Sequence, residues 1–184
     1  MPDADAVIIT GVYGSGKSSV AAEIADVLQK RGHPYAYLDL DFLSWASSGR
    51  DEEGAEHRML LRNLAPVVSN YLDAGVKFFI LAGFVGDRGK LETLRGELRM
   101  PLRVVRLALA LDEIERRLRS DATTGRRDAL REAAAQIAAS EGVGLEDLAV
   151  PNDRPVHQVA TEIIDWLGWG RTDMPSGGEQ EWSG

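Results

Sequence analysis

The stretch VIITGVYGSGKSSVAAEIADVL, residues 7–28, contains the pattern that decides how this sequence is expected to fold. It passes from an apolar run of strand length, through three glycines, into a segment with apolar residues at helical spacing. Residues 11–18 satisfy the pattern G-x-x-x-x-G-K-[ST]. Glycines let several backbone N–H groups approach a phosphate chain at once, and they permit positive φ angles. We therefore predict a phosphate-binding loop at a strand-to-helix junction.

The side chains of this loop also have chemical uses. Lys17 supplies a mobile positive charge for the β- and γ-phosphates, and the Ser18 hydroxyl is a suitable ligand for Mg²⁺. The following helix adds the unpaired amides and the dipole of its first turn. A chance glycine-rich turn is the alternative, expected on the order of once in a hundred chains of this length. The residues predicted to bind nucleotide here are Gly11, Gly14, Ser15, Gly16, Lys17, Ser18 and Ser19.

Apolar runs of strand length alternate along the chain with segments of helical period. Strands are predicted at 7–10, 34–40, 76–83, 102–111 and 145–150, and helices at 18–31, 56–74, 86–98, 112–118, 128–141 and 155–167. We expect Pro66 to kink the second helix and Asp112 to cap the fourth. Such alternation indicates an α/β fold with a parallel sheet covered by helices on both faces. One domain is expected over residues 1–170, followed by a flexible polar tail at 171–184.

Composition narrows the function classes. A net charge of −8 and a pI near 4.9 argue against nucleic acid binding through a broad basic face. The chain has no cysteine, so disulfides and thiolate chemistry are excluded, and its three histidines are scattered singly. No apolar run is long enough for a membrane span, and the N-terminus has no signal pattern. We expect a cytoplasmic protein without a nucleic acid or membrane partner.

Two aspartates follow the second predicted strand. In an extended segment, alternation would place Asp39 and Asp41 on one face, at the edge of the sheet where ligands bind. One carboxylate would hold Mg²⁺ through water, and the other would orient or deprotonate an acceptor hydroxyl. A solvated loop or a helix cap is the alternative.

Polar and small residues also follow the third strand. Gly83 would let a substrate lie close to the backbone, and Asp87 would reach the site, although Asp87 as a simple helix cap is an equal alternative. Arg58 and Arg62, together with Arg50, lie in the segment expected to form the acceptor side, and they indicate an anionic acceptor.

Arginines concentrate after the fourth strand. Arg116, Arg117 and Arg119 precede the segment SDATTG, and Arg126 and Arg127 follow it. We predict a small closing lid at about residues 119–130, whose arginines neutralise a transferring phosphoryl group. A solvated helix face is the alternative.

The segment PNDRP, residues 151–155, follows the fifth strand. We expect this turn to lie beside the glycine loop and to surround the adenine base with Asp153 and Arg154. An ordinary loop and helix cap is the alternative.

Taken together, these motifs resemble those of the P-loop small-molecule kinases related to gluconate kinase, shikimate kinase, adenylylsulfate kinase and chloramphenicol phosphotransferase. The resemblance covers residues 6–168 and depends on GVYGSGKSS, on LDLD and on LDEIERRLRSD. It implies a five-stranded parallel sheet of order 2-3-1-4-5, with ATP and Mg²⁺ as phosphoryl donor. It also implies that Arg117 packs against adenine. Many relatives carry a second lid arginine four residues after the first, whereas this chain has Asp121 there.

The leading hypothesis is a kinase that moves the γ-phosphoryl group of MgATP to a hydroxyl of a small molecule. The predicted catalytic residues are Lys17, Asp39, Asp41, Arg126 and Arg127; the predicted metal ligands are Ser18 and Asp39; the predicted substrate-binding residues are Asp41, Arg58, Arg62, Gly83 and Asp87. The alternatives are a nucleotide-dependent switch without an acceptor, and an ATP-binding protein that has lost turnover. A guanine-specific switch is disfavoured because no N-K-x-D or T-K-x-D is present.

Overall fold

A computed structural model describes residues 3–45, 54–120, 136 and 144–170 of the chain. Its centre is a five-stranded sheet in which the neighbouring strands run parallel, in the order β2-β3-β1-β4-β5. The sheet order implied by the resemblance to P-loop kinases is therefore confirmed. The strands are β1 (Asp5–Thr10), β2 (Tyr35–Asp39), β3 (Phe78–Ala82), β4 (Leu102–Ala108) and β5 (Leu148–Pro151). The helices are α1 (Lys17–Lys30), α2 (Leu40–Ser44), α3 (Ala55–Asp73), α4 (Arg88–Leu98), α5 (Leu111–Ser120) and α7 (Val156–Leu167).

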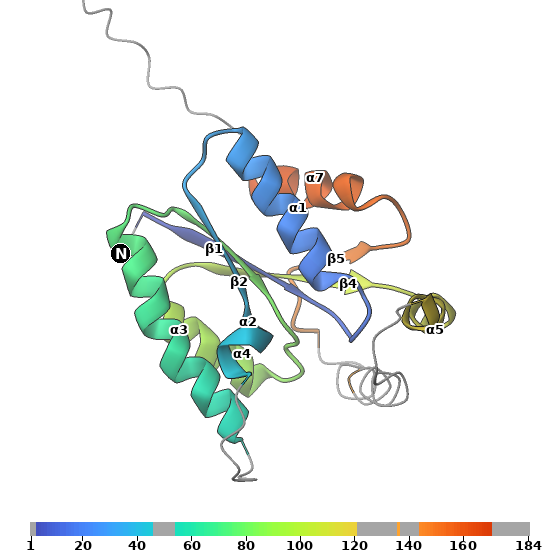
Figure 1. The fold of residues 1–184 in the computed structure, drawn as a ribbon, viewed down its shortest axis with the longest axis horizontal. Helices are drawn as coiled ribbons and strands as arrows, with labels where there is room; N and C mark the ends of the chain where they lie inside the picture. The colour runs from blue at the N-terminus through green and yellow to red at the C-terminus, as the bar shows by residue number, and fades with distance from the viewer. Residues whose placement is uncertain (1–2, 46–53, 121–135, 137–143, 171–184) are drawn as a thin grey trace, which may run out of the picture.

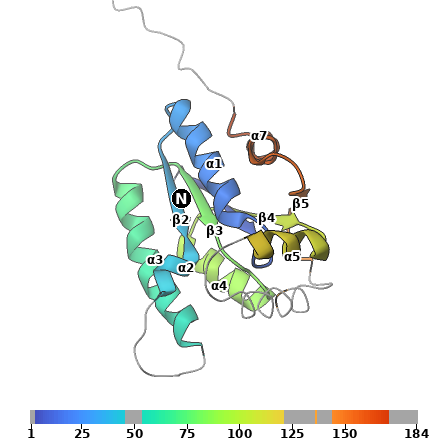
Figure 2. The same cartoon turned by 45° about the vertical axis from the view of Figure 1, so that its right-hand side comes forward.

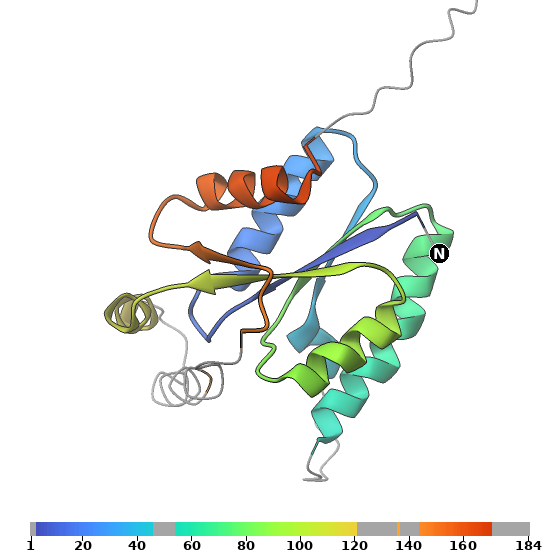
Figure 3. The same ribbon diagram turned by 180° about the vertical axis from the view of Figure 1, so that it is seen from behind.

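Helices cover both faces of the sheet. Figure 1 shows α1 and α7 on one face and α3 and α4 on the other, and the view from behind (Figure 3) shows the same layers. Alternation along β1 explains how one strand serves both faces, because successive side chains point in opposite directions. Val7 and Ile9 pack with the α1 and α7 side, while Ala6 and Ile8 pack with the α3 and α4 side. All four side chains are fully buried, as expected for the central strand of a parallel sheet.

The first helix forms where the sequence predicts it. Val20, Ile24 and Leu28, at helical spacing, are fully buried against the sheet. Gly16, with a left-handed φ of 94°, turns the chain from the loop into α1. The helix ends before Gly32, whose φ is also positive.

The end of β2 differs from the prediction. A strand was expected through Leu40, but β2 ends at Asp39 and the short helix α2 begins at the next residue. The cause is capping: the Asp39 side chain accepts a hydrogen bond of 3.1 Å from the backbone N–H of Asp41. The expectation that Asp39 and Asp41 lie on one face of an extended segment is therefore wrong.

The sequence predicted a cap at Asp112 for α5 and a kink at Pro66 in α3. Asp112 does not cap α5, because the helix begins at Leu111 and the Ala110 carbonyl accepts from Ile114 N at 3.1 Å. Asp112 lies in the first turn, where it accepts from Glu113 N at 2.9 Å. The helix α3 continues through Pro66.

Three predictions lie outside the described residues. These are the lid beyond residue 120, the helix at 128–141 apart from Gln136, and the tail at 171–184. Among the helices that are described, none has the length and apolarity needed to cross a membrane.

The two ends of the described chain meet at the amino-terminal edge of the sheet. Trp169, 3% exposed, donates from its indole nitrogen to the Asp5 carboxylate at 2.9 Å and packs against Phe78, with ring centroids 5.0 Å apart. Arg103 forms an ion pair with the same carboxylate and donates to the carbonyl of Leu167 at 2.9 Å. This cluster attaches the segment after α7 to the start of β1.

Replacing Trp169 with alanine should lower the free energy of unfolding by about 3–5 kcal/mol, because it leaves a large cavity and removes a partner of a half-buried carboxylate. Urea unfolding would measure the loss. The matched control is Trp166→Ala, which removes a side chain that is 38% exposed and should cause less than half that loss. Equal losses in the two variants would contradict the role given to Trp169.

Candidate functional site

The glycine loop between β1 and α1 has the backbone that phosphate binding requires. Gly11, Gly14 and Gly16 have φ angles of 143°, 80° and 94°, values that L side chains rarely adopt. The loop is closed by a hydrogen bond of 3.1 Å from Ser15 N to the carbonyl of Val12. Its concave side is continued by the first-turn amides of α1. Such a row of N–H groups is a ready site for an anion.

Lys17, the first residue of α1, lies across this loop. Its ammonium group donates to the carbonyl of Val12 at 3.2 Å, so the charge is held at the mouth of the loop. A flexible side chain in this position can exchange the carbonyl for a phosphate oxygen at small cost, because both are hydrogen-bond acceptors.

The Ser18 hydroxyl and Asp39 form the clearest contact between two predicted site residues. Ser18 Oγ donates to Asp39 Oδ2 at 2.8 Å, which joins the start of α1 to the end of β2. The other oxygen of Asp39 caps α2, so this side chain both caps a helix and contacts the residue that follows Lys17. The two interpretations of Asp39 drawn from the sequence are therefore compatible.

These two oxygens suit a magnesium ion. Mg²⁺ prefers oxygen ligands and usually keeps several waters, being held by one or two protein groups together with phosphate oxygens. Within the described residues there is no group of three or more His, Asp or Glu side chains that could hold a metal alone. The pair Ser18 and Asp39 thus fits a site completed by a nucleotide and water, rather than an all-protein cage.

Tyr37, two residues before Asp39, borders the same pair. Its hydroxyl donates to the carbonyl of Ser18 at 3.5 Å. The pKa of Tyr37 is raised above its ordinary value, first because burial disfavours the phenolate and second because the Asp39 carboxylate lies beside it. The phenol therefore stays protonated at neutral pH and remains a donor.

The turn after β5 lies beside the glycine loop through Asn152, a residue that sequence reasoning missed. Asn152 is 1% exposed, and its side-chain amide donates to the carbonyl of Ser15 at 2.6 Å. A Cβ atom added to Gly16 would lie 2.6 Å from that amide nitrogen, so only glycine leaves room for it. The rule that ligands bind beyond the carboxyl ends of strands pointed to this turn, but it did not say which side chain would turn inward.

Arg117 reaches the same turn from α5, which lies beside the carboxyl ends of β4 and β5 (Figure 2). It donates to the carbonyl of Asn152 at 2.5 Å, and its Nε donates to Glu113 at 2.8 Å. Hydrogen bonds from Arg116, and then from Arg117, hold the pKa of Glu113 below its ordinary value. Glu113 is therefore an anion at neutral pH, and it keeps Arg117 directed at the glycine loop.

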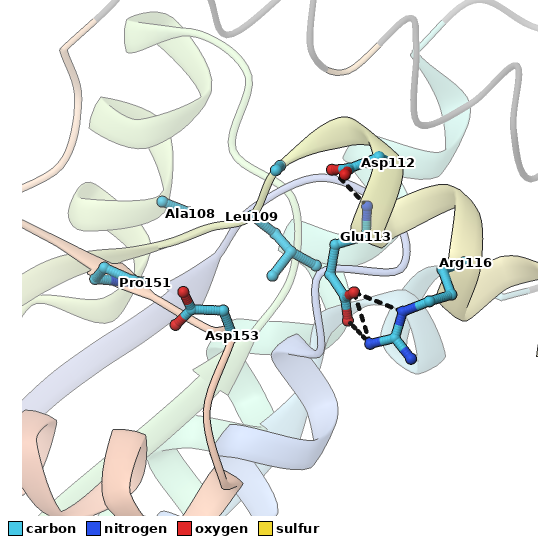
Figure 4. Close-up of a pocket in the computed structure, with 8 residues that line it drawn as sticks. Ala108, Leu109, Asp112, Glu113, Arg116, Pro151 and Asp153 are labelled. Atoms are coloured by element: carbon cyan, nitrogen blue, oxygen red, sulfur yellow. Dashed lines mark hydrogen bonds and ion pairs between the residues drawn. The ribbon is translucent and has the colours of Figure 1, made fainter.

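A hollow of about 500 Å³ opens between α5 and the end of β5. Figure 4 shows Asp153 on one side of it and Glu113 and Arg116 on the other. Arg154 forms an ion pair with Glu162 of α7. The residues that line the hollow are Ala108, Leu109, Ala110, Asp112, Glu113, Arg116, Pro151 and Asp153.

Two of the residues predicted for the acceptor side, Asp87 and Gly83, have structural roles of their own. Asp87 is the N-cap of α4 and accepts from Lys90 N at 2.8 Å. A Cβ atom on Gly83 would lie 3.0 Å from the Leu40 side chain, so this glycine makes room for α2. Arg58 and Arg62 are exposed, one turn apart near the start of α3. Their contact with a substrate stays a prediction.

Arg126 and Arg127, the predicted lid arginines, lie outside the described residues. Gln136 is described, and it was also missed: its side-chain oxygen accepts from the backbone N–H of Tyr13, inside the glycine loop, at 2.6 Å. Gln136 and Tyr13 are 123 positions apart, which explains why no local pattern indicated this contact.

Comparison with known proteins identifies the fold. No family model matches this sequence, and no curated protein is similar to it in sequence. Among solved structures, a sugar kinase from Janibacter sp. is 22% identical with a TM-score of 0.66, over 90% of this chain and 95% of that one. A gluconokinase from Sinorhizobium meliloti is 18% identical with a TM-score of 0.64, over 92% and 94%. The Mycobacterium tuberculosis APS kinase, in complex with AMPPNP and APS, is 25% identical with a TM-score of 0.61, over 91% and 99%. The fold is that of the P-loop small-molecule kinases, and the resemblance seen in the sequence is confirmed at this level.

Replacing Gly16 with alanine should weaken nucleotide binding at least about tenfold, because the new Cβ meets Asn152 at a backbone angle that alanine resists. Titration with a fluorescent ATP analogue would measure the change. Gly96→Ala in α4 is the matched control, since nothing lies within 4 Å of its Cβ position. This variant should bind the nucleotide normally and have a slightly higher free energy of unfolding, because alanine favours the helix more than glycine does. Normal binding by Gly16→Ala would contradict the description of the loop.

The raised pKa of Tyr37 predicts a pH effect on stability. The folded protein holds the phenolic proton more tightly than the unfolded chain, so this group destabilises the fold as pH rises from the unfolded pKa of about 10. Tyr37→Phe should therefore lose less stability than the wild type as the pH rises above about 10. Urea unfolding at each pH would measure the difference. Parallel pH curves for the two proteins would show that the proton is not held in this way.

Proposed function

We propose that this protein is an ATP-dependent phosphotransferase that moves the γ-phosphoryl group of MgATP to a hydroxyl of a small-molecule acceptor. The observation that carries the proposal is the hydrogen bond between Ser18 and Asp39, at the mouth of a glycine loop of positive φ angles. A phosphate loop, a hydroxyl and a carboxylate in one place are the parts that phosphoryl transfer from a magnesium nucleotide needs.

The chain's own residues would bind and orient the donor. The loop amides and Lys17 would hold the β- and γ-phosphates, and the hollow between α5 and β5 would take the base beside Arg117 and Asp153. Ser18 and Asp39 would hold Mg²⁺, which when bound neutralises charge on the phosphate oxygens.

The acceptor would lie on the α2 side of the loop. In the transfer, the acceptor oxygen bonds to the γ-phosphorus while the bond from that phosphorus to the β-phosphate oxygen breaks, and ADP leaves. Asp41, in the first turn of α2, would orient the attacking hydroxyl and take its proton. Arg126 and Arg127 would neutralise the charge that develops on the transferring group. Gly83, Asp87, Arg58 and Arg62 complete the proposed acceptor surface.

The solved structures with the same fold support this proposal. They include a sugar kinase, a gluconokinase and an APS kinase, the last in complex with AMPPNP and APS. Each phosphorylates a small molecule, as its name states, and each aligns with nine-tenths or more of this chain.

The test is ADP release from MgATP, with and without a panel of small hydroxylated acceptors. We expect an acceptor-dependent increase in the wild type. Lys17→Ala should lose about 100-fold or more, because it removes the positive charge that would stabilise the transferring phosphoryl group. Lys30→Ala is the matched control: it removes a lysine from the exposed last turn of the same helix and should leave ADP release unchanged.

Asp39→Asn and Asp41→Asn separate the two carboxylates. Asp39→Asn should raise the magnesium concentration needed for half-maximal activity, whereas Asp41→Asn should lower kcat with little effect on ATP binding. Tight ATP binding with slow ADP release that no acceptor increases would instead favour a nucleotide-dependent switch. Equal ATP affinity in Lys17→Ala and the wild type would reject the nucleotide site itself.

A further inference from the structure

Two large aromatic side chains are exposed at α2, Phe42 within the helix and Trp45 at its C-cap. Phe42 is 68% exposed and Trp45 is 79% exposed, more than any other large hydrophobic residue in the described part of the chain. Their rings are stacked, with centroids 5.6 Å apart and planes inclined by 26°. An exposed apolar surface of this kind commonly marks a binding site.

Three contacts hold α2, the short helix that contains Phe42 and precedes Trp45. Asp39 caps its first turn, and the amide of Asn63 on α3 donates to the carbonyl of Leu43 at 2.7 Å. Leu40 is buried against Gly83. The leucines of α2 thus face the core and the aromatic side chains face outward, so the rings are held on an anchored element and are organised before a ligand arrives.

The position of the pair relates it to the proposed reaction. Phe42 comes three residues after Asp39, or about 5 Å along a helix axis, and Asp39 is bonded to Ser18 at 2.8 Å. Asp41 lies between them in sequence and adds a carboxylate, the group that accepts hydrogen bonds from hydroxyls. The aromatic pair and two carboxylates that can accept from hydroxyls therefore belong to one short segment, residues 39–45, which begins at the Ser18–Asp39 contact.

We propose that Phe42 and Trp45 form a stacking surface for the phosphoryl acceptor, and that the acceptor is a ring compound with an apolar face, such as a pyranoside, a cyclitol or a nucleoside. This inference rests on the proposed kinase function. A ring places its apolar face on the aromatic pair while its hydroxyls reach the carboxylates. An open-chain polyol has no flat face to offer and loses more rotational freedom on binding.

The experiment compares two groups of acceptors in the ADP-release assay with MgATP. The ring compounds are methyl β-D-glucopyranoside, myo-inositol and uridine, and the open-chain compounds are D-gluconate, D-sorbitol and glycerol. We expect at least one ring compound to increase ADP release about tenfold or more, and to do so better than every open-chain compound.

Variants then test the surface itself with the most active ring compound. Phe42→Ala and Trp45→Ala should each raise its KM about tenfold while kcat changes less than about twofold, whereas Trp45→Phe should keep most of the affinity. The matched control is Tyr71→Ala, which removes another exposed aromatic side chain near the C-terminus of α3. This variant should leave the KM of the ring compound unchanged. Binding should also shift the tryptophan emission of the wild type but not that of Trp45→Phe.

Several results would overturn the inference. These are an increase with open-chain compounds alone, no increase with any ring compound, or an unchanged KM in both alanine variants. A wild-type dimer in light scattering that Trp45→Ala dissociates would assign the pair to self-association instead. If only open-chain compounds increase ADP release and Lys17→Ala abolishes that increase, the ring acceptor is rejected and the kinase function is kept. If Lys17→Ala binds ATP as tightly as the wild type, the kinase function itself is rejected.

Discussion

The hydrogen bond between Ser18 and Asp39 is the contact on which the arrangement of the site depends. β1 and β2 are not neighbours, because β3 lies between them, and this bond joins the helix that follows β1 to the end of β2. The second oxygen of Asp39 starts α2. The Asp39 carboxylate therefore fixes the phosphate loop and the proposed acceptor surface relative to each other. A substitution at Asp39 would disturb both the contact with Ser18 and the start of α2.

A buried polar contact fixes the other side of the loop. Asn152 donates to the Ser15 carbonyl, and Arg117 donates to the Asn152 carbonyl, so β5, α5 and the loop form one network. In an interior of low dielectric, hydrogen bonds of this kind are strong and costly to break. Gly16 is part of the same constraint, since the network leaves no space for a side chain there.

Much of the fold was predictable because its signals are local. Val7 and Ile9 alternate with Ala6 and Ile8 in a fully apolar run, and such a run belongs in the centre of a parallel sheet. The glycine loop was predictable because its spacing is dictated by the backbone angles that phosphate binding needs.

The errors arose where two local rules competed or where contacts are distant. Asp39 and Asp41 fit the alternation of a strand, but Asp39 is also a strong N-cap, and capping decided the conformation. Asn152 and Gln136 were missed because they are 137 and 123 positions away from the loop residues that they contact. Hydrophobic periodicity also does not indicate the direction of a side chain in the turn that follows a strand.

The cluster around Trp169 has a consequence for synthesis of the chain. Asp5 and its indole partner are 164 positions apart in the sequence. Pairing with β3 and the ion pair with Arg103 involve earlier residues, so the indole contact is the last contact of this cluster that can form as the chain is made. Contacts of such long range form late and slowly. During translation, the Asp5 carboxylate therefore lacks its indole donor until residue 169 has been made.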